Sequence, residues 1–222
     1  MSKTALVVGA SGLIGRYCVE YLLEHSAYDR VKILVRRAFP LQHPKLTIYQ
    51  IDFADLESHI TELSADDVFC TLGTTIAKAG SQAAFRKIDF DYPVKIAAFL
   101  QHLEAQQFLI VTSMGADARS RVFYNRVKGE VEEALRKIPF NAIHFFRPSL
   151  LLGERNEYRR GERIGASVMS AMDPLFLGPL RKYRPILARD VAHAMVLTAQ
   201  KNIPGMHIYE SDIIQQAAGS AA

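Results

Sequence analysis

The sequence contains few cysteines and lacks a segment long and apolar enough to cross a membrane. Its two cysteines, Cys18 and Cys70, lie in apolar surroundings without CxxC spacing or a flanking histidine. This pattern supports neither a disulfide framework nor a zinc site, so we expect buried free thiols and no metal. The most apolar late stretch, residues 140–152, is interrupted by His144 and Arg147 and is too short to span a bilayer, so no membrane insertion is expected.

The first residues lead us to expect no targeting leader, and the sequence has no strong excess of one charge. Because no basic leader with an apolar run and a cleavage site precedes the first strand, we expect a cytoplasmic protein. The 27 lysines and arginines exceed the 23 acidic residues by only four. Without regularly interleaved aromatics this balance argues against nucleic acid binding. We expect a small-molecule substrate and a monomer or homodimer.

Length and composition are those of an ordinary globular protein. The chain has 222 residues, of which 49% are hydrophobic and 23% are charged. These values exclude a disordered or fibrous protein and suit one domain. We expect a single domain over residues 1–222, in which residues 149–215 form a small substrate-side appendage and residues 216–222 form a flexible tail.

Short apolar runs alternate with longer amphipathic segments as far as residue 150. This alternation predicts an α/β fold, a Rossmann-type doubly wound parallel sheet with the small C-terminal appendage. The strands are continuous apolar runs, as burial on both faces of a sheet requires. The predicted strands are residues 4–8, 31–35, 46–51, 67–72, 108–112 and 142–146, with a short one near 207–209. The predicted helices are residues 13–25, 85–106, 124–137 and 190–200.

A glycine-rich loop follows the first predicted strand and leads directly into a helix. Its glycines, Gly9, Gly12 and Gly15, follow a GxxGxxG spacing. Glycines allow a tight turn and close backbone approach, so that the first N–H groups of the helix can meet a pyrophosphate. A turn that binds nothing is the alternative, which the strand–loop–helix context disfavours. The predicted cofactor-binding residues of this loop are Gly9, Ala10, Ser11, Gly12, Leu13, Ile14, Gly15 and Arg16.

The end of the second strand carries the signal for the choice between NAD and NADP. A carboxylate there would bind the 2′-hydroxyl of NAD, whereas arginine accommodates the 2′-phosphate of NADP. Here the strand is followed by Arg36 and Arg37 with no acidic residue, so we expect NADP(H) in preference to NAD(H). Solvated surface arginines are the alternative. Asp52 and Phe53, after the third strand, are predicted at the adenine, although Asp52 would equally serve as a turn residue.

Three residues with complementary chemistry follow the fifth strand. Ser113 lies at the strand's carboxyl end, where open α/β sheets bind ligands. Tyr124 and Lys128 are spaced i,i+4 and therefore share one face of a helix. A neighbouring ammonium favours a phenolate, which suits tyrosine to proton transfer. Taken singly, each residue is more typical of a turn or a solvated helix surface, but their combination with the glycine loop favours function.

Together these motifs resemble the short-chain dehydrogenase/reductase superfamily. The superfamily pattern combines a glycine loop, a serine and Tyr-x-x-x-Lys, matched here by Tyr124 and Lys128. The finer resemblance is to the atypical branch of Tat-interacting-protein-like NAD(P)-binding oxidoreductases, and it covers nearly the whole chain. It rests on residues 71–75, 78–81, 85–89, 112–117 and 147–155.

The resemblance implies a role for each matching residue. Tyr124 would be the general acid/base, Lys128 would bind the nicotinamide ribose and tune the tyrosine, and Ser113 would polarise a substrate carbonyl. The end of the fourth strand would line the cofactor, and the turn after the sixth would flank the nicotinamide. The residues implied there are Thr71, Leu72, Gly73 and Thr74, followed by Arg147, Pro148 and Ser149.

The sequence departs from the superfamily pattern at two places. The asparagine that typical members carry in the helix after the fourth strand is missing, and Asp89 occupies the nearest matching position. The usual Asn-Asn-Ala-Gly is replaced by residues 71–74. The first departure puts the proton relay, and turnover itself, in question.

The most consistent interpretation is an NADP(H)-dependent oxidoreductase that acts on a small carbonyl or alcohol by hydride transfer. One alternative is an NADP(H)-binding regulatory or scaffold protein with little or no turnover. A nucleotide-sugar epimerase or dehydratase shares the loop and the Tyr–Lys pair, but normally needs a larger substrate domain than the residues after Pro148 provide.

Two segments of the appendage each allow a functional and a purely structural interpretation. An arginine-rich stretch would form a lid that meets an acidic substrate or a phosphate, but its mixed charges favour a self-paired, solvated loop. An apolar stretch would form an adaptable wall, but plain core packing is the favoured interpretation. The residues concerned are Arg155, Arg159, Arg160 and Arg163 in the first stretch, and Met169, Met172, Leu175, Phe176 and Leu177 in the second.

Overall fold

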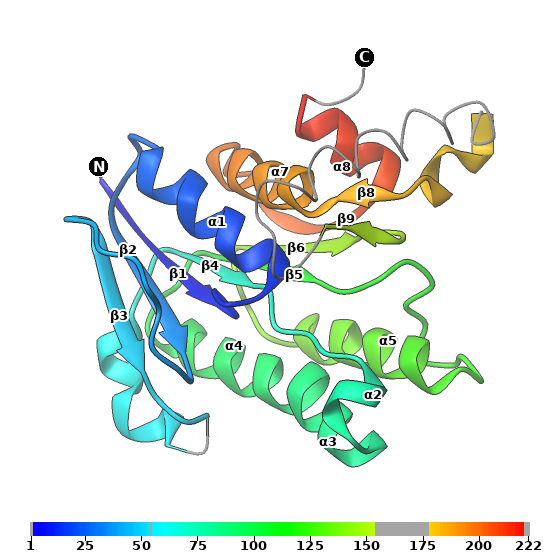
Figure 1. Cartoon of the computed structure of the whole chain (residues 1–222), viewed down its shortest axis with the longest axis horizontal. Helices are drawn as coiled ribbons and strands as arrows, with labels where there is room; N and C mark the ends of the chain where they lie inside the picture. The colour runs from blue at the N-terminus through cyan, green and yellow to red at the C-terminus, as the bar shows by residue number, and fades with distance from the viewer. Residues whose placement is uncertain (1, 54, 154–177, 220–222) are drawn as a thin grey trace.

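One parallel sheet organises the protein, whose computed structural model describes residues 2–53, 55–153 and 178–219 (Figure 1). The strand order is β3-β2-β1-β4-β5-β6-β9. This order confirms the predicted Rossmann-type α/β fold. Because the order reverses between β1 and β4, the carboxyl ends of these two strands form the crevice where such sheets bind ligands. The strands are β1 (Lys3–Val8), β2 (Tyr28–Val35), β3 (Leu46–Gln50), β4 (Asp67–Cys70), β5 (Gln107–Val111), β6 (Ala142–Arg147) and β9 (Gly205–Glu210).

Helices cover both faces of the sheet and divide the core into two layers. On one face α1, α7 and α8 pack, and on the other lie η1, α4 and α5 (Figure 1). These helices are α1 (Leu13–Glu24), η1 (Leu56–Leu63), α4 (Tyr92–His102), α5 (Phe123–Leu135), α7 (Ala188–Gln200) and α8 (Ser211–Ala217). None of the helices in the described part of the chain has the length and apolarity of a membrane span.

The central strands are buried on both faces, as their apolar sequences predict. Every residue of β4 and β5 is buried. Cys18 and Cys70 are free thiols, one in each core layer. Burial raises the pKa of both thiols, that of Cys70 to about 12, so both stay protonated and inert.

The residues after Pro148 contribute to the main sheet as well as to the region beyond it. β9 pairs in parallel with β6, and α7 packs against α1. A separate two-stranded unit pairs β7 (Leu151–Leu152) with β8 (Ile186–Leu187), next to the short helix η4 (Gly178–Tyr183). Part of the predicted appendage therefore completes the sheet. Its arginine-rich and methionine-containing stretches lie outside the described residues.

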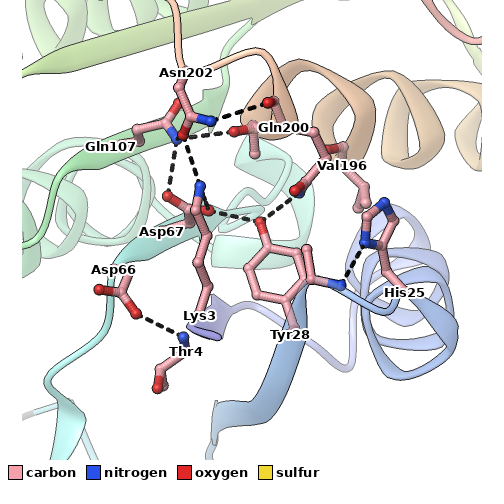
Figure 2. A network of polar contacts seen from close by, with 12 residues as sticks. Lys3, Thr4, His25, Tyr28, Asp66, Asp67, Gln107, Val196, Gln200 and Asn202 are labelled. Atoms are coloured by element: carbon pink, nitrogen blue, oxygen red, sulfur yellow. Dashed lines mark hydrogen bonds and ion pairs between the residues drawn. The ribbon is translucent and has the colours of Figure 1, made fainter. Parts of the chain in front are cut away.

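A buried polar network ties together the amino ends of the central strands (Figure 2). The Tyr28 hydroxyl donates to Asp67 at 2.6 Å, and the Lys3 ammonium lies 3.1 Å from the same carboxylate oxygen. The Gln107 amide donates to the other oxygen of Asp67 at 2.9 Å. Burial, reinforced by the adjacent carboxylate, raises the pKa of the Tyr28 phenol above its ordinary range. The network is satisfied internally, and it lies at the edge of the sheet opposite the ligand-binding crevice.

His144 on β6 extends this network toward β9. Its ring is fully buried. Nε2 lies 3.3 Å from the side-chain amide oxygen Oε1 of Gln107, and Nδ1 lies 3.1 Å from the Tyr209 hydroxyl. The His207 ring stacks on it at a centroid distance of 5.3 Å. Burial, with a smaller contribution from His207, lowers the pKa of His144 to about 4. The folded protein therefore holds this imidazole in its neutral form.

We predict that His144 makes the protein less stable in mild acid. Because its folded pKa is about 4 and the ordinary value is 6.5, the unfolded chain binds the proton first as the pH falls below 6.5. This residue should therefore remove about 2 kcal/mol of unfolding free energy between pH 7 and pH 5. Urea unfolding of the wild type and of His144→Gln at both pH values measures this loss. An equal pH dependence in the two proteins would contradict the assignment.

Candidate functional site

The glycine loop joins β1 to α1 at the switch point of the sheet. Gly9 has a φ of 91°, a left-handed conformation that favours glycine, and its carbonyl accepts the Gly12 N–H at 2.8 Å. The helix α1 begins at Leu13 without a side-chain cap and without an acidic residue in its first turn. Its first N–H groups and the positive end of its dipole are therefore available to an anion.

Close packing around the loop explains why its glycines are required. A Cβ atom built on Gly15 would lie 2.2 Å from the Gly9 carbonyl oxygen and 2.7 Å from the Thr71 hydroxyl. The Thr71 hydroxyl in turn donates to the Val8 carbonyl at 3.1 Å, which holds the ends of β1 and β4 together. The bare backbone at this point forms a cradle of the kind that a pyrophosphate requires, so the residues present fit a dinucleotide.

A pocket of about 720 Å³ opens in front of this loop. Its walls come from the glycine loop, the end of β2 and the segment after β4. Four cationic side chains contribute to the lining, and no acidic side chain does among the described residues. The cationic residues are Arg16, Arg36, Arg37 and Lys78. Because no carboxylate in the described part of the chain pairs with them, their charge is available to a phosphate-bearing ligand.

The far side of the pocket is aromatic. Phe53 stacks on Tyr92 of α4, with ring centroids 4.7 Å apart and planes 22° apart, and both residues line the pocket. Such a pair offers a flat apolar surface to a planar ring. Asp52, predicted beside Phe53, is exposed and does not belong to the lining residues. Its contact with an adenine stays a prediction.

A second pocket of about 250 Å³ adjoins the first. Both are lined by Gly12, by the segment from Thr71 to Thr74 and by Lys78. The second pocket adds Tyr124 and Lys128 from α5. The glycine loop and the Tyr–Lys pair, which are more than 100 residues apart in the sequence, therefore face adjoining cavities.

Tyr124 and Lys128 differ in their surroundings. The Tyr124 ring is half-buried and packs against Phe85 at a centroid distance of 5.5 Å. The Lys128 side chain is buried, and its ammonium lies 2.7 Å from Oδ1 of the buried Asp89. Burial alone would lower the pKa of Lys128, but the attraction of the Asp89 carboxylate and of the Tyr124 oxygen outweighs burial and raises this pKa above its ordinary value.

Asp89 lies on a π-helical turn, η2 (Lys87–Asp91), between α3 (Gln82–Arg86) and α4. Its Oδ2 accepts the backbone N–H of Thr74 at 3.0 Å. The carboxylate therefore joins the segment after β4 to the lysine of α5. From the sequence, Asp89 is notable only because it stands where an asparagine is expected. No sequence pattern predicts its contact with Lys128.

Ser113 lies just beyond the carboxyl end of β5. It is buried and its hydroxyl has no hydrogen-bond partner among the described residues, but it does not line either pocket. The preceding Thr112 lines the smaller pocket, and its hydroxyl donates to Glu132 at 2.7 Å. The predicted role of Ser113 toward a substrate stays a prediction.

The turn after β6 is held by structural contacts. The Arg147 guanidinium donates to the buried carboxylate of Glu132 from Nε at 2.9 Å and from Nη2 at 2.5 Å, and this bonding raises the pKa of Arg147. The carbonyl of Pro148 accepts the Met114 N–H, and the Ser149 N–H donates to Ser211. None of the three predicted residues, Arg147 to Ser149, lines either pocket, so their contact with the nicotinamide stays a prediction.

Some lining residues are not among the predicted cofactor-binding residues. Lys78, on the four-residue helix α2 (Ile76–Ala79), lines both pockets. Tyr92 and Ile88 line the larger one. Lys78 and Ile88 belong to segments that carry the family resemblance, but only the folded arrangement shows that they line a pocket. In the described part of the chain, no cluster of histidine, cysteine or carboxylate side chains is suited to a metal ion.

Comparison with known proteins gives the class of the site. Residues 9–143, more than half of the chain, match the model of a family described as NAD(P)H-binding. The chain belongs to this NAD(P)H-binding family, which confirms the predicted membership of the atypical short-chain dehydrogenase/reductase group.

Two relatives define its position within that family. Protein HTATIP2 of Rattus norvegicus is 33% identical over 165 residues, which cover 72% of this chain and 68% of the relative. Protein FMP52 of Candida albicans, named as mitochondrial, is 32% identical over 208 residues, which cover 91% of this chain and 90% of the relative.

Solved structures share the fold at low sequence identity. A UDP-N-acetylglucosamine 4-epimerase from Methanobrevibacter ruminantium superposes with a TM-score of 0.68 at 15% identity, covering 94% of this chain and 76% of the epimerase. An ADP-L-glycero-D-manno-heptose-6-epimerase from Helicobacter pylori gives a TM-score of 0.66 at 16% identity, covering 98% and 83%. These likenesses show the fold alone.

Proposed function

We propose that this protein is an NADP(H)-dependent oxidoreductase that interconverts a small carbonyl compound and its alcohol. The proposal rests on the observation that the two pockets adjoin each other. One holds the dinucleotide loop, the other holds Tyr124 and Lys128, and the segment from Thr71 to Thr74 lines both. A nucleotide bound along the first pocket would have its reactive end beside a proton donor in the second.

The preference for NADP(H) follows from the charge of the larger pocket. Arg36 and Arg37 extend beyond β2, at the position where NAD-specific sites of this fold carry a carboxylate. Arg16 and Lys78 add two further cations to the lining. Guanidinium groups match phosphate oxygens in a fork geometry, so we assign the 2′-phosphate to Arg36 and Arg37.

The chain's own residues would supply position and a proton. When bound, the nicotinamide ring gives or accepts the hydride. The Tyr124 hydroxyl donates a proton to the carbonyl oxygen during reduction and recovers it during oxidation. Lys128 keeps a positive charge beside that oxygen, and the apolar side chains of Leu13, Val111 and Leu151 limit water in the smaller pocket.

A regulatory or scaffold protein that binds NADP(H) with little turnover is the second candidate. It is favoured by the position of Ser113, which does not line the pocket where a carbonyl would need to be polarised. A protein of this class would bind the cofactor as tightly as an enzyme. Its Tyr124 would be dispensable.

The experiment that separates the two candidates is a turnover assay. Purified protein is incubated with NADPH and a panel of aldehydes and ketones, and oxidation of the cofactor is followed by absorbance. The oxidoreductase proposal predicts substrate-dependent oxidation by the wild type. Tight NADPH binding without oxidation across aliphatic and aromatic carbonyls would favour the regulatory candidate.

A further inference from the structure

The buried ammonium of Lys128 requires a compensating charge. The Lys128 side chain is 5% exposed and the Asp89 side chain is fully buried, with 2.7 Å between Nζ and Oδ1. A buried ammonium without a partner loses its hydration, and proteins respond by releasing the proton. A negatively charged group within the site must therefore keep Lys128 protonated.

The groups that face this ammonium come from three elements in the described part of the chain. Asp89 lies on η2, Tyr124 on α5 and Cys70 on β4. Cys70 is a fully buried thiol whose pKa burial raises to about 12, so it provides no anion near neutral pH. Tyr124 exchanges its proton in the proposed reaction and is no fixed charge. Asp89 is the carboxylate among the three.

The Asp89 carboxylate is held in place on both of its oxygens. Oδ1 faces Lys128, and Oδ2 accepts the N–H of Thr74 at 3.0 Å. Thr74 belongs to the segment that lines both pockets. The turn that carries Asp89 is π-helical, a conformation that is rare and often associated with functional sites. The hydrogen bond from Thr74 therefore attaches the Asp89 carboxylate to the segment that lines both pockets.

We propose that Asp89 is a positioning residue that keeps Lys128 protonated and thereby sets the upper pH limit at which the Tyr124–Lys128 pair works. The proposal rests on the proposed oxidoreductase function for its catalytic consequence, although the charge state of Lys128 does not depend on it. Asp89 stands where typical members of the superfamily carry an asparagine. In this chain its carboxylate compensates the charge of the Lys128 ammonium. A purely structural role, in which Asp89 only joins η2 to α5, would have no such effect.

The test is a carbon-13 NMR titration of lysine ε-carbons in the cofactor-free full chain. The Lys128 signal is assigned by its loss in Lys128→Met. In Asp89→Asn, which keeps the shape but removes the charge, we expect the acid dissociation constant of Lys128 to rise by at least about tenfold. A titration of Lys128 in Asp89→Asn that superimposes on the wild type would overturn the proposal.

Glu130→Gln is the matched control. Glu130 is a carboxylate on the same helix that pairs with Arg86 and Arg126 and does not contact Lys128. The same chemical change there should leave the Lys128 titration as in the wild type, and Asp89→Glu should preserve the charged lysine. Failure of Asp89→Glu to preserve the charged lysine, or a loss in Glu130→Gln equal to that in Asp89→Asn, would contradict a specific role of the Asp89 charge.

A double variant decides the case in which Asp89→Asn does not fold. Removing both partners of a buried ion pair costs less than removing one. Asp89→Asn combined with Lys128→Met should therefore fold if the uncompensated ammonium causes the failure. If the double variant also fails to fold, Asp89 is a structural residue and the proposal is wrong.

Turnover provides the second readout. In Asp89→Asn, the rate of NADPH-dependent reduction should decline at a lower pH than in the wild type and recover when the pH is lowered. A profile scaled down equally at every pH would contradict the proposal. If the wild type has no turnover, the proposed function fails while the NMR titration still decides the role of Asp89.

Discussion

Replacing Tyr124 by phenylalanine should abolish most of the turnover and leave cofactor binding intact. The phenylalanine ring retains the packing against Phe85, which lies at a centroid distance of 5.5 Å, so only the hydroxyl is lost. Removal of a general acid/base typically costs about 10²- to 10⁴-fold in rate. We therefore expect a loss of that size in kcat for NADPH-dependent carbonyl reduction, with an NADPH Kd close to that of the wild type.

Tyr49→Phe is the matched control for this variant. Tyr49 lies on β3 and packs against the core layer of α4 and α5, and it does not line either pocket. The same deletion of a hydroxyl there should leave the rate unchanged. Full activity in Tyr124→Phe would exclude Tyr124 as the proton donor and would favour the regulatory interpretation.

Replacing Gly15 by alanine should remove cofactor binding. The added methyl group would lie 2.2 Å from the Gly9 carbonyl oxygen, a backbone atom that cannot move without displacing the loop. Overpacking of this kind costs about 1–3 kcal/mol, and the displaced loop no longer presents its N–H groups to a pyrophosphate. We expect NADPH affinity to fall by about 100-fold or more, which corresponds to about 2.7 kcal/mol.

The control for Gly15→Ala is Gly219→Ala. A Cβ on Gly219 meets no atom within 4 Å, although its φ of 73° disfavours alanine. This variant should lose a little stability and keep its NADPH affinity. Isothermal titration measures both affinities, and thermal unfolding measures the stability. Wild-type affinity in Gly15→Ala would show that the loop does not bind the dinucleotide backbone.

The parts of the fold that local sequence signals determine could be predicted. Strands with continuous apolar residues, such as β4 and β5, are recognisable because burial on both faces leaves no alternation. The glycine loop is recognisable because its spacing and its strand–helix context together specify a tight turn.

The contacts that complete the site could not be predicted, because they join distant segments. The pairing of Asp89 with Lys128 depends on how η2 packs against α5, which no periodicity encodes. No local pattern predicts the four-residue helix α2, which places Lys78 in the lining of both pockets. The ion pair of Arg147 with Glu132 likewise joins β6 to α5, two elements whose packing no local pattern predicts.

The prediction for Ser113 illustrates a different limit. Its position after β5 is correct for a ligand-binding residue, since Thr112, one residue earlier, lines the smaller pocket. Val111 and Thr112 line the smaller pocket and Ser113 does not, so the strand end alone does not determine which side chain faces a ligand. A motif therefore locates a site to within a residue, and packing decides which side chain it contains.

We propose that the cationic end of the larger pocket, formed by Arg36 and Arg37, binds the 2′-phosphate of NADP(H). The most direct test titrates NADPH and NADH into the wild type, Arg36→Ala and the control Arg30→Ala, an exposed arginine at the opposite end of β2. We expect tighter binding of NADPH than NADH by the wild type, and in Arg36→Ala a loss of NADPH affinity of about 10- to 100-fold with NADH affinity retained. Failure of both cofactors to bind the wild type, or an equal loss of both in Arg36→Ala, would contradict the account.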